Sequence, residues 1–226
     1  MVGVEALIRW QHPRRGLLDA EQIIPLAEDN GLVVDLGEWV LRTACSQACE
    51  WREAGFPRLR MAVNVSARQM RDERLVKVVK RALRVNDMAR GQLEIEITES
   101  TLQSGSNCLA TLQQLKDLGV FLAIDDFGTG YSCLSSLKYL PIDRVKIDRA
   151  FVRDLQSDPN DVAITDAIIA MAHRLNLQVV AEGVETLEQA ELLRVRDCDE
   201  VQGYLYSKPL EAASIEDLLR AQTLRH

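Results

Sequence analysis

The sequence predicts an α/β fold in which helices cover a mostly parallel sheet. Short apolar runs rich in β-branched residues alternate with amphipathic segments along all 226 residues, and no linker rich in Ser, Gly or Pro interrupts them. Repeated strand–helix units of this kind build a parallel sheet, which is either doubly wound or closed into a (β/α) barrel. We therefore predict a single domain over residues 1–226 and leave both architectures open.

Seven segments are predicted as strands because each is a short run dominated by apolar and β-branched side chains. In residues 93–98, for example, three apolar residues alternate with Glu94, Glu96 and Thr98. The predicted strands cover residues 4–10, 60–66, 93–98, 120–127, 144–148, 178–184 and 200–207.

Helices are predicted between these strands. In residues 37–55 the apolar side chains recur at three- and four-residue steps, and the segment closes on Gly55, as helices often do. Pro141 is expected to stop a shorter helix, and Ser214 is expected to cap the last one. The predicted helices cover residues 21–31, 37–55, 74–85, 108–119, 131–141, 161–176, 187–197 and 214–225.

The composition excludes several classes of function. The formal net charge of -7 argues against a surface for polymeric nucleic acid, although metal ions could still reverse the sign locally for a small phosphorylated ligand. No apolar run approaches the roughly 20 residues of a membrane span, and the first residues do not form a signal peptide. The five cysteines include no CxxC pair, which predicts reduced thiols and a cytoplasmic protein.

The three histidines are His12, His173 and His226, and none has the spacing of a metal ligand. Their positions in a loop, a helix and the terminus make Ser/His/Asp or Cys/His catalysis an unattractive explanation. The chemistry of this chain is therefore expected to rest on other polar residues.

Polar residues gather where the predicted strands end. Asp125 and Asp126 are adjacent and follow a buried-looking apolar run, where two unpaired carboxylates would repel each other. Glu94 and Glu96 lie two residues apart, so they share one face of their strand. Because ligands of parallel α/β proteins bind at the carboxyl ends of the strands, this edge is the predicted site. The other polar residues there are Glu5, Arg9, Asn64, Glu99, Lys146, Asp148, Glu182, Glu185 and Gln202.

These side chains predict a site for a hard divalent cation. Oxygen ligands from successive strands, with no histidine nearby, suit Mg²⁺ or Mn²⁺ rather than zinc. Two such ions about 3.5–4 Å apart could activate water and hold a phosphoryl oxygen. Lys146 and Arg9 would add positive charge beside the phosphate. Metal ions would also explain why Asp125 and Asp126 can stand side by side.

Seven motifs occur along the chain in this order: EALIRW, NVS, EITES, DDFGTGYS, VKIDRAFV, VVAEGVET and QGYLYSKP. Together they resemble the EAL-domain family, the phosphodiesterases of cyclic di-GMP, over nearly the whole chain. The resemblance implies a modified TIM-like (β/α) barrel that hydrolyses cyclic di-GMP to linear 5′-pGpG. It also implies a requirement for Mg²⁺ or Mn²⁺, with two ions, and inhibition by Ca²⁺.

The resemblance also implies metal ligands and catalytic residues, motif by motif. Asp125 would bridge two ions, Lys146 would contact the attacking water, and Glu182 matches the proposed base as well as a ligand. With Glu5, Lys146 and Glu182 form the expected catalytic set. The expected metal ligands are Glu5, Asn64, Glu96, Asp125, Asp126 and Glu182.

Four further positions match family residues that bind substrate or shape the site. Arg9 matches an arginine that binds a substrate phosphate, and Glu185 and Gln202 match other active-site positions. Glu99 matches a glutamate that steadies a loop. The DDFGTGYS segment corresponds to a loop associated with dimerisation, so the resemblance is compatible with a homodimer.

One departure from the family concerns the N-terminus. Members of the family begin about one strand earlier, and our seven predicted strands are one fewer than the eight of a closed barrel. We therefore expect this chain to lack the family's first strand, as a fragment of a longer multidomain protein, a shortened gene product or a sequence with a misplaced start would. Its first and last strands, residues 4–10 and 200–207, should then each expose one edge.

Two alternative functions stay open at this point. The first is a catalytically weak or inactive module that binds cyclic di-GMP or a protein; the intact set of site residues argues against it, and the expected missing strand argues for it. The second is another metal-dependent barrel enzyme, such as an enolising one with a lysine base. The adjacent Asp125 and Asp126 and the EALIRW motif argue against that second alternative.

Overall fold

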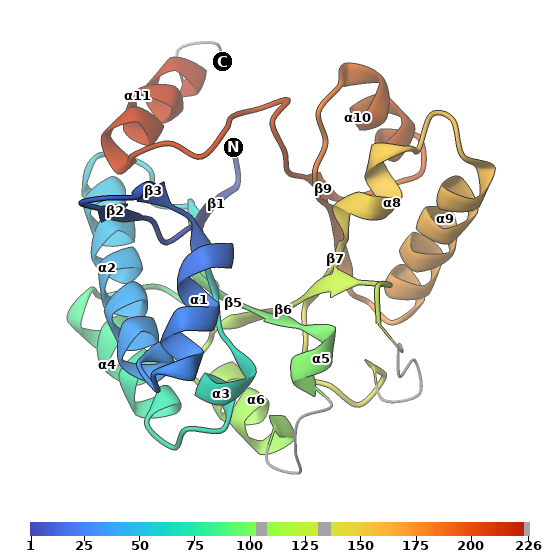
Figure 1. Ribbon diagram of the computed structural model, residues 1–226. Coiled ribbons are helices and arrows are strands. Elements are labelled where there is room, and N and C mark those ends of the chain that lie inside the picture. The colour runs from blue at the N-terminus through green and yellow to red at the C-terminus, as the bar shows by residue number, and fades with distance from the viewer. Residues whose placement is uncertain (103–107, 131–136, 224–226) are drawn as a thin grey trace. The chain divides into compact units, whose positions relative to one another are not determined.

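The computed structural model describes residues 1–102, 108–130 and 137–223. Its contacts divide the chain into two compact units. Unit 1 comprises Met1–Glu96, Ser104–Phe121 and Pro209–His226, and unit 2 comprises Ile97–Gln103 and Leu122–Lys208. The parallel strands follow the order β1-β4-β5-β6-β7-β8-β9, and described helices lie in the sequence between most successive parallel strands (Figure 1). The predicted TIM-like α/β class and its seven parallel strands are confirmed.

Unit 1 contains three of the parallel strands. They are β1 (Gly3–Ala6), β4 (Arg60–Asn64) and β5 (Leu93–Thr98, whose last two residues belong to unit 2). Glu5 lies opposite Ala62, and Asn64 lies opposite Glu96. This register brings polar residues of three strands to one end of the sheet.

Three strand predictions are wrong in their extent, and the predicted strand 178–184 is one of them because it ends at Ala181. The predicted strand 4–10 ends at Ala6, and Trp10–His12 instead forms β2, which pairs antiparallel with β3 (Gly16–Leu18). Pro13 and Gly16, the latter at φ 74°, allow the tight turn of this hairpin. The predicted strand 200–207 is reduced to β9 (Glu200–Val201), because the chain turns at Gly203 and the Tyr206 amide donates to the Gly203 carbonyl.

Most helices of unit 1 begin and end within two residues of their predicted bounds. The predicted helix 37–55 instead begins at Val33, and the short helix Ala67–Met70 was not predicted. Asp19 and Gln22 form a capping box at the start of α1, and Leu41, Ala44, Cys45 and Trp51 bury one face of α2. Ser214 does not cap the last helix, because that helix already begins at Ala212. The helices are α1 (Ala20–Asp29), α2 (Val33–Glu53), α3 (Ala67–Met70), α4 (Leu75–Val85), α6 (Cys108–Asp117) and α11 (Ala212–Thr223).

Unit 2 holds the remaining parallel strands. They are β6 (Phe121–Phe127, whose first residue belongs to unit 1), β7 (Arg144–Ile147), β8 (Gln178–Ala181) and β9. Arg144 is buried and donates to Gln178 on β8 and, through two nitrogens, to Glu200 on β9. These hydrogen bonds connect the short β9 to β7 and β8 at the amino ends of the strands.

Helices α8, α9 and α10 accompany these strands (Figure 1). Asp158 caps α9, and Pro159 is the first residue of that helix. Thr186 and Gln189 form a capping box at the start of α10. The predicted helix 131–141 falls largely outside the described residues. The helices of unit 2 are α5 (Glu99–Leu102), α8 (Arg149–Arg153), α9 (Pro159–Arg174) and α10 (Leu187–Arg194).

Each unit buries an apolar layer between its strands and helices. In unit 1 the side chains of Met61, Ile95 and Leu112 are almost fully buried, and in unit 2 Val145, Ile147 and Ile169 play the same part. Among the described helices, none has both the length and the apolar character that crossing a bilayer requires.

Gly203→Ala is expected to lower the free energy of unfolding by about 3 kcal/mol or more. A Cβ at this position would lie 2.2 Å from the backbone oxygen of Val184 and 2.3 Å from its nitrogen. The Val184 amide donates to the Gln202 carbonyl and the Val184 carbonyl accepts from the Leu205 amide, so moving either atom would break a hydrogen bond. Chemical denaturation of the purified chain measures the loss.

Gly16→Ala is the matched control, because Gly16 has a positive φ of 74° but no atom within 4 Å of the added Cβ. Its expected cost is the backbone strain alone, about 1 kcal/mol. Equal losses for the two variants would contradict the steric argument.

Candidate active site

Three predicted ligands lie together at the carboxyl ends of the strands of unit 1. The amide nitrogen Nδ2 of Asn64 donates to Oε1 of Glu5 over 2.6 Å. Glu96 stands opposite Asn64 in the register of β4 and β5, and only 2% of it is exposed. Strand alternation puts Glu5, Asn64 and Glu96 on one face of this sheet. The structure therefore brings these three oxygen donors together.

Glu94 shares that face but has a different environment. Its carboxylate lies 3.4 Å from a guanidinium nitrogen of Arg60, and that guanidinium in turn stacks 5.2 Å over the ring of Phe121. A buried carboxylate that is matched by a guanidinium has no need of a metal ion. Glu94 thus serves the packing of unit 1, and Glu96 is the ligand candidate of the pair.

The two adjacent aspartates of unit 2 occupy a bend in β6. The register of β6 with β7 shifts between Ile124 and Phe127, and Asp126 adopts a left-handed backbone with φ 53°. In a regular strand the two side chains would point to opposite faces. Because of the bend, carboxylate oxygens of Asp125, Asp126 and Glu182 all lie within 4.8 Å of one another.

Lys146 lies at the centre of this cluster. Its ammonium nitrogen is 3.1 Å from Oδ1 of Asp125 and 2.7 Å from Oε1 of Glu182, and its side chain is 1% exposed. A buried lysine is stabilised only where negative charge surrounds it. The strand β7 therefore delivers a fixed positive charge between two carboxylates from neighbouring strands.

Asp126 lies in a partly buried setting beside other carboxylates, and this setting raises its pKa. Burial raises the pKa of Asp126 from 3.8 to about 6, and the charge of Asp125 and a hydrogen bond that protonated Asp126 donates to Asp148 add to the rise. A cation close to the carboxylate would favour its ionised form. The cluster Asp125, Asp126 and Glu182 consists of hard oxygen donors and fits a divalent ion such as Mg²⁺ or Mn²⁺.

Glu99 contacts the loop that follows β6. It is 6% exposed, and its Oε2 accepts a hydrogen bond of 3.4 Å from the amide of Gly128. A Cβ on Gly130 would lie 3.3 Å from the carboxylate, so only a small residue fits there comfortably. These contacts support the predicted role of Glu99 toward this loop, whose continuation over 131–136 lies outside the described residues.

Three predicted substrate ligands are exposed. Arg9 follows β1 in unit 1, and its guanidinium donates to the carbonyl oxygen of Ile8 over 2.8 Å. Gln202 is held through its backbone, whose amide donates to Ala181. The amide of Glu185 donates to Oε1 of Gln189. Their side chains face solvent, so a ligand could reach them, and their part in binding stays a prediction.

Residues 1–209 match the model of the EAL domain family. The chain belongs to the EAL domain family. It is 48% identical over 219 residues to "Cyclic di-GMP phosphodiesterase NbdA" of Pseudomonas aeruginosa, an alignment of 96% of this chain and 28% of that protein. It is 42% identical over 214 residues to "Cyclic di-GMP phosphodiesterase PdeR" of Escherichia coli, covering 94% of this chain and 32% of PdeR. This EAL chain therefore spans about a third or less of the length of these two relatives.

Solved structures show the same fold. The chain in the structure "PaMucR Phosphodiesterase, c-di-GMP complex" is 46% identical, with a TM-score of 0.91 and coverage of 95% of this chain and 87% of that one. The EAL domain of Mycobacterium smegmatis DcpA is 42% identical with a TM-score of 0.78, and the match covers 84% and 86% of the two chains. The fold of the EAL chain is thus shared with structures of clear sequence similarity.

The sequence alone predicts no specific role for Asp148, which touches the acidic cluster of this EAL chain. Its side chain hydrogen-bonds to Asp126 and also accepts the amide of Ala150 over 2.7 Å, which caps α8. The sequence does contain one indication that Asp148 lies near the cluster. Asp148 follows Lys146 by two residues, and strand alternation puts both side chains on the same side of β7 and its extension.

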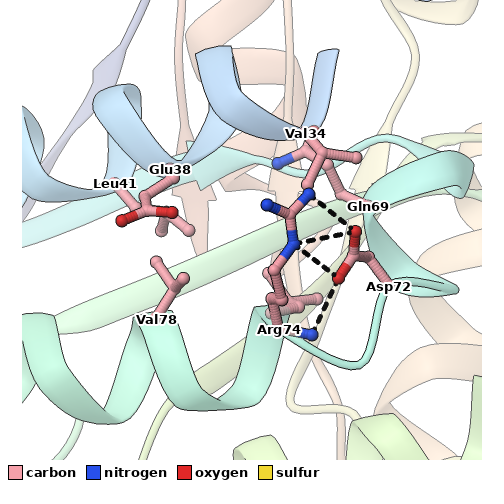
Figure 2. A pocket seen from close by; sticks show the side chains of 8 residues that line it. Val34, Glu38, Leu41, Gln69, Asp72, Arg74 and Val78 are labelled. Atoms are coloured by element: carbon pink, nitrogen blue, oxygen red, sulfur yellow. Dashed lines mark hydrogen bonds and ion pairs between the residues drawn. The ribbon is translucent and has the colours of Figure 1, made fainter. Parts of the chain in front are cut away.

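A small pocket of the EAL chain lies elsewhere in unit 1, between α2 and α4 (Figure 2). The Arg74 guanidinium donates to the Asp72 carboxylate over 3.1–3.3 Å, and this hydrogen bonding lowers the pKa of Asp72. The pocket has a largely apolar lining with one matched ion pair, and it lacks a set of converging ligands. Its lining residues are Val34, Glu38, Leu41, Gln69, Asp72, Arg74, Leu75 and Val78.

Proposed function

We propose that this EAL chain is a metal-dependent phosphodiesterase that hydrolyses cyclic di-GMP to 5′-pGpG. The observation that carries the proposal is the cluster of Asp125, Asp126 and Glu182 around the buried Lys146. The names of the relatives NbdA and PdeR, both cyclic di-GMP phosphodiesterases, support the reaction. The similar MucR phosphodiesterase structure, which is a c-di-GMP complex, supports the substrate.

Divalent ions are proposed as cofactors, Mg²⁺ or Mn²⁺, with two ions for turnover. Asp125, Asp126 and Glu182 would hold an ion in unit 2, and Glu5, Asn64 and Glu96 are proposed as further ligands. A bound ion of this kind supplies a water of lowered pKa and positive charge for a phosphoryl oxygen. All six side chains offer the hard oxygen donors that Mg²⁺ and Mn²⁺ prefer.

The residues of the chain itself would orient the reactants. Lys146 would contact the attacking water and hold the carboxylates of Asp125 and Glu182 in place, since its ammonium already lies within 3.1 Å of both. Glu182 is proposed both as a metal ligand and as the acceptor of the water's proton, two roles that compete for one carboxylate. Arg9, Glu185 and Gln202 would bind the substrate, and Arg9 would pair with a phosphate.

The direct test is to incubate the purified chain with cyclic di-GMP and Mn²⁺ and to separate the products by chromatography. We expect 5′-pGpG to accumulate, and we expect none after chelation of the metal. Binding of cyclic di-GMP without any 5′-pGpG, in Mn²⁺ and in Mg²⁺, would support the alternative of a binding module instead. The homodimer and the cytoplasmic location remain predictions, to be tested by light scattering and by fractionation.

Ca²⁺ is expected to bind the chain but to support less than about a hundredth of the turnover seen with Mn²⁺, because it prefers longer bonds and looser geometry than Mg²⁺. Calorimetry measures the binding, and product formation measures the turnover. Adding Ca²⁺ to the Mn²⁺ reaction should inhibit it competitively. Brisk hydrolysis in Ca²⁺ alone, after Mg²⁺ and Mn²⁺ have been removed, would contradict the proposed role of the ions.

A further inference from the structure

Helix α4 carries an unusual row of positive charge on its solvent side. The side chains of Lys77, Lys80, Arg81 and Arg84 are exposed, and the helix Leu75–Val85 contains no acidic residue. Their spacing of i, i+3, i+4 and i+7 places all four on a single face. In a chain of net charge -7 this is a local reversal of sign.

The opposite face of α4 is already used for packing. Leu75, Val79 and Ala82 are buried there, and the helix packs against α2 and α6 within unit 1. Figure 1 shows α4 beside α2. The buried apolar side is therefore already used, and the basic row faces outward together with Val85, which is also exposed.

The four basic side chains make no ion pair with any residue that the structure describes. Two other helices pair an arginine internally: Arg194 of α10 pairs with Glu191, and Arg220 of α11 pairs with Glu216. Arg74, one turn before Lys77, turns toward Asp72 and is matched there (Figure 2). The unmatched row thus begins at Lys77, and four like charges within about 10 Å repel one another.

We propose that this row, Lys77, Lys80, Arg81 and Arg84, is a docking surface for an acidic protein segment. The matching partner is a helix that carries Glu or Asp at the same i, i+3, i+4 and i+7 spacing. The acidic side chains of such a helix can pair with all four basic side chains of the row at once. The row is narrow and short, and exposed acidic residues, Glu73 and Asp87, flank it along the chain. A flat anionic bilayer or a long nucleic acid would also come close to these two acidic side chains and be repelled by them. An acidic protein segment as short as the row would not extend to them.

The test uses a fluorescently labelled alanine-based peptide with four glutamates at that spacing, and anisotropy as the readout. Binding by the full chain should weaken by about tenfold in the quadruple variant Lys77→Gln/Lys80→Gln/Arg81→Gln/Arg84→Gln, since exposed ion pairs contribute modestly but together. Binding should also weaken between about 0.05 M and about 0.3 M NaCl, because salt screens exposed charges.

The control variant removes the same number of positive charges, but from exposed arginines outside the row. It is Arg14→Gln/Arg15→Gln/Arg58→Gln/Arg174→Gln. It should bind the peptide within about twofold of the unaltered chain, since none of the four lost charges belongs to the row and salt screens exposed charges. Equal weakening by the two variants, or no binding of the peptide at low salt, would overturn the proposal. A second experiment tests the alternative of a lipid partner. It measures sedimentation of the chain with vesicles that contain about one-third phosphatidylserine. Binding to these vesicles through the row, without binding of the peptide, would replace the protein partner by an anionic lipid surface.

Circular dichroism and thermal melting exclude misfolding as a cause of lost binding. The substituted side chains are exposed, so both variants should melt like the unaltered chain. If the quadruple variant melts lower, the pairs Lys77→Gln/Lys80→Gln and Arg81→Gln/Arg84→Gln are compared instead, and each should lose part of the affinity.

Discussion

Asp125→Ala is expected to lower kcat for cyclic di-GMP hydrolysis by about a thousandfold or more, which is about 4 kcal/mol of transition-state stabilisation. Asp125 contributes one of the three clustered carboxylates and lies 3.1 Å from the ammonium of Lys146. Its removal takes away a proposed metal ligand and leaves Lys146 with less compensating charge. The measurements are product formation with Mn²⁺ and, separately, binding of Mn²⁺ by calorimetry.

Asp117→Ala is the control for this substitution. Asp117 is an exposed residue at the end of α6 whose carboxylate accepts only a hydrogen bond from Gln113, so turnover should be unchanged. Glu5→Ala, which removes the partner of the Asn64 amide, should abolish turnover as Asp125→Ala does. Near-normal hydrolysis by Asp125→Ala or Glu5→Ala, with metal still bound, would disprove the assignment of ligands.

Lys146→Ala is expected to lower kcat by about a hundredfold to a thousandfold while the dissociation constant for cyclic di-GMP changes only a few-fold. The ammonium is buried between Asp125 and Glu182, so it cannot reach far into solvent to hold a ligand, whereas it is fixed beside the two carboxylates. A cation in that position acts mainly as charge develops in the reaction. Affinity measured in Ca²⁺ and turnover measured in Mn²⁺ separate the two effects.

Lys138→Ala provides the matched lysine control, because Lys138 is exposed and its ammonium lies over the ring of Tyr139, with no ion pair to any described residue. A loss of affinity with unchanged kcat in Lys146→Ala would make Lys146 a substrate clamp. Lys146→Met, which keeps more of the buried volume, tests whether any loss of activity comes from a collapsed cavity. It should be as inactive as Lys146→Ala if the charge is what matters.

Much of the fold could be predicted from the sequence. Each parallel strand lies within or close to a predicted apolar run, because burial on both faces of a parallel sheet demands apolar side chains throughout. The residues at which strands begin and end are harder to predict from the sequence. Residues 4–10 and 200–207 look like strands by composition, yet only Gly3–Ala6 and Glu200–Val201 join the parallel sheet. Turn-forming residues such as Pro13, Gly16 and Gly203 redirect the neighbouring aromatic residues into a hairpin and a turn.

Within the candidate site, the sequence by itself determined which kinds of ligand are present: carboxylates and an amide at strand ends, one lysine, and no suitable histidine. Only the tertiary structure decided which of them act together. Glu94 and Glu96 are indistinguishable by alternation, and Arg60 separates them by matching Glu94. Asp125 and Asp126 should point apart in a regular strand, but the bend of β6 turns both toward Glu182. Local periodicity fixes the face of a residue, whereas its charge partners come from other strands, and a strand's irregularity depends on the strand paired with it.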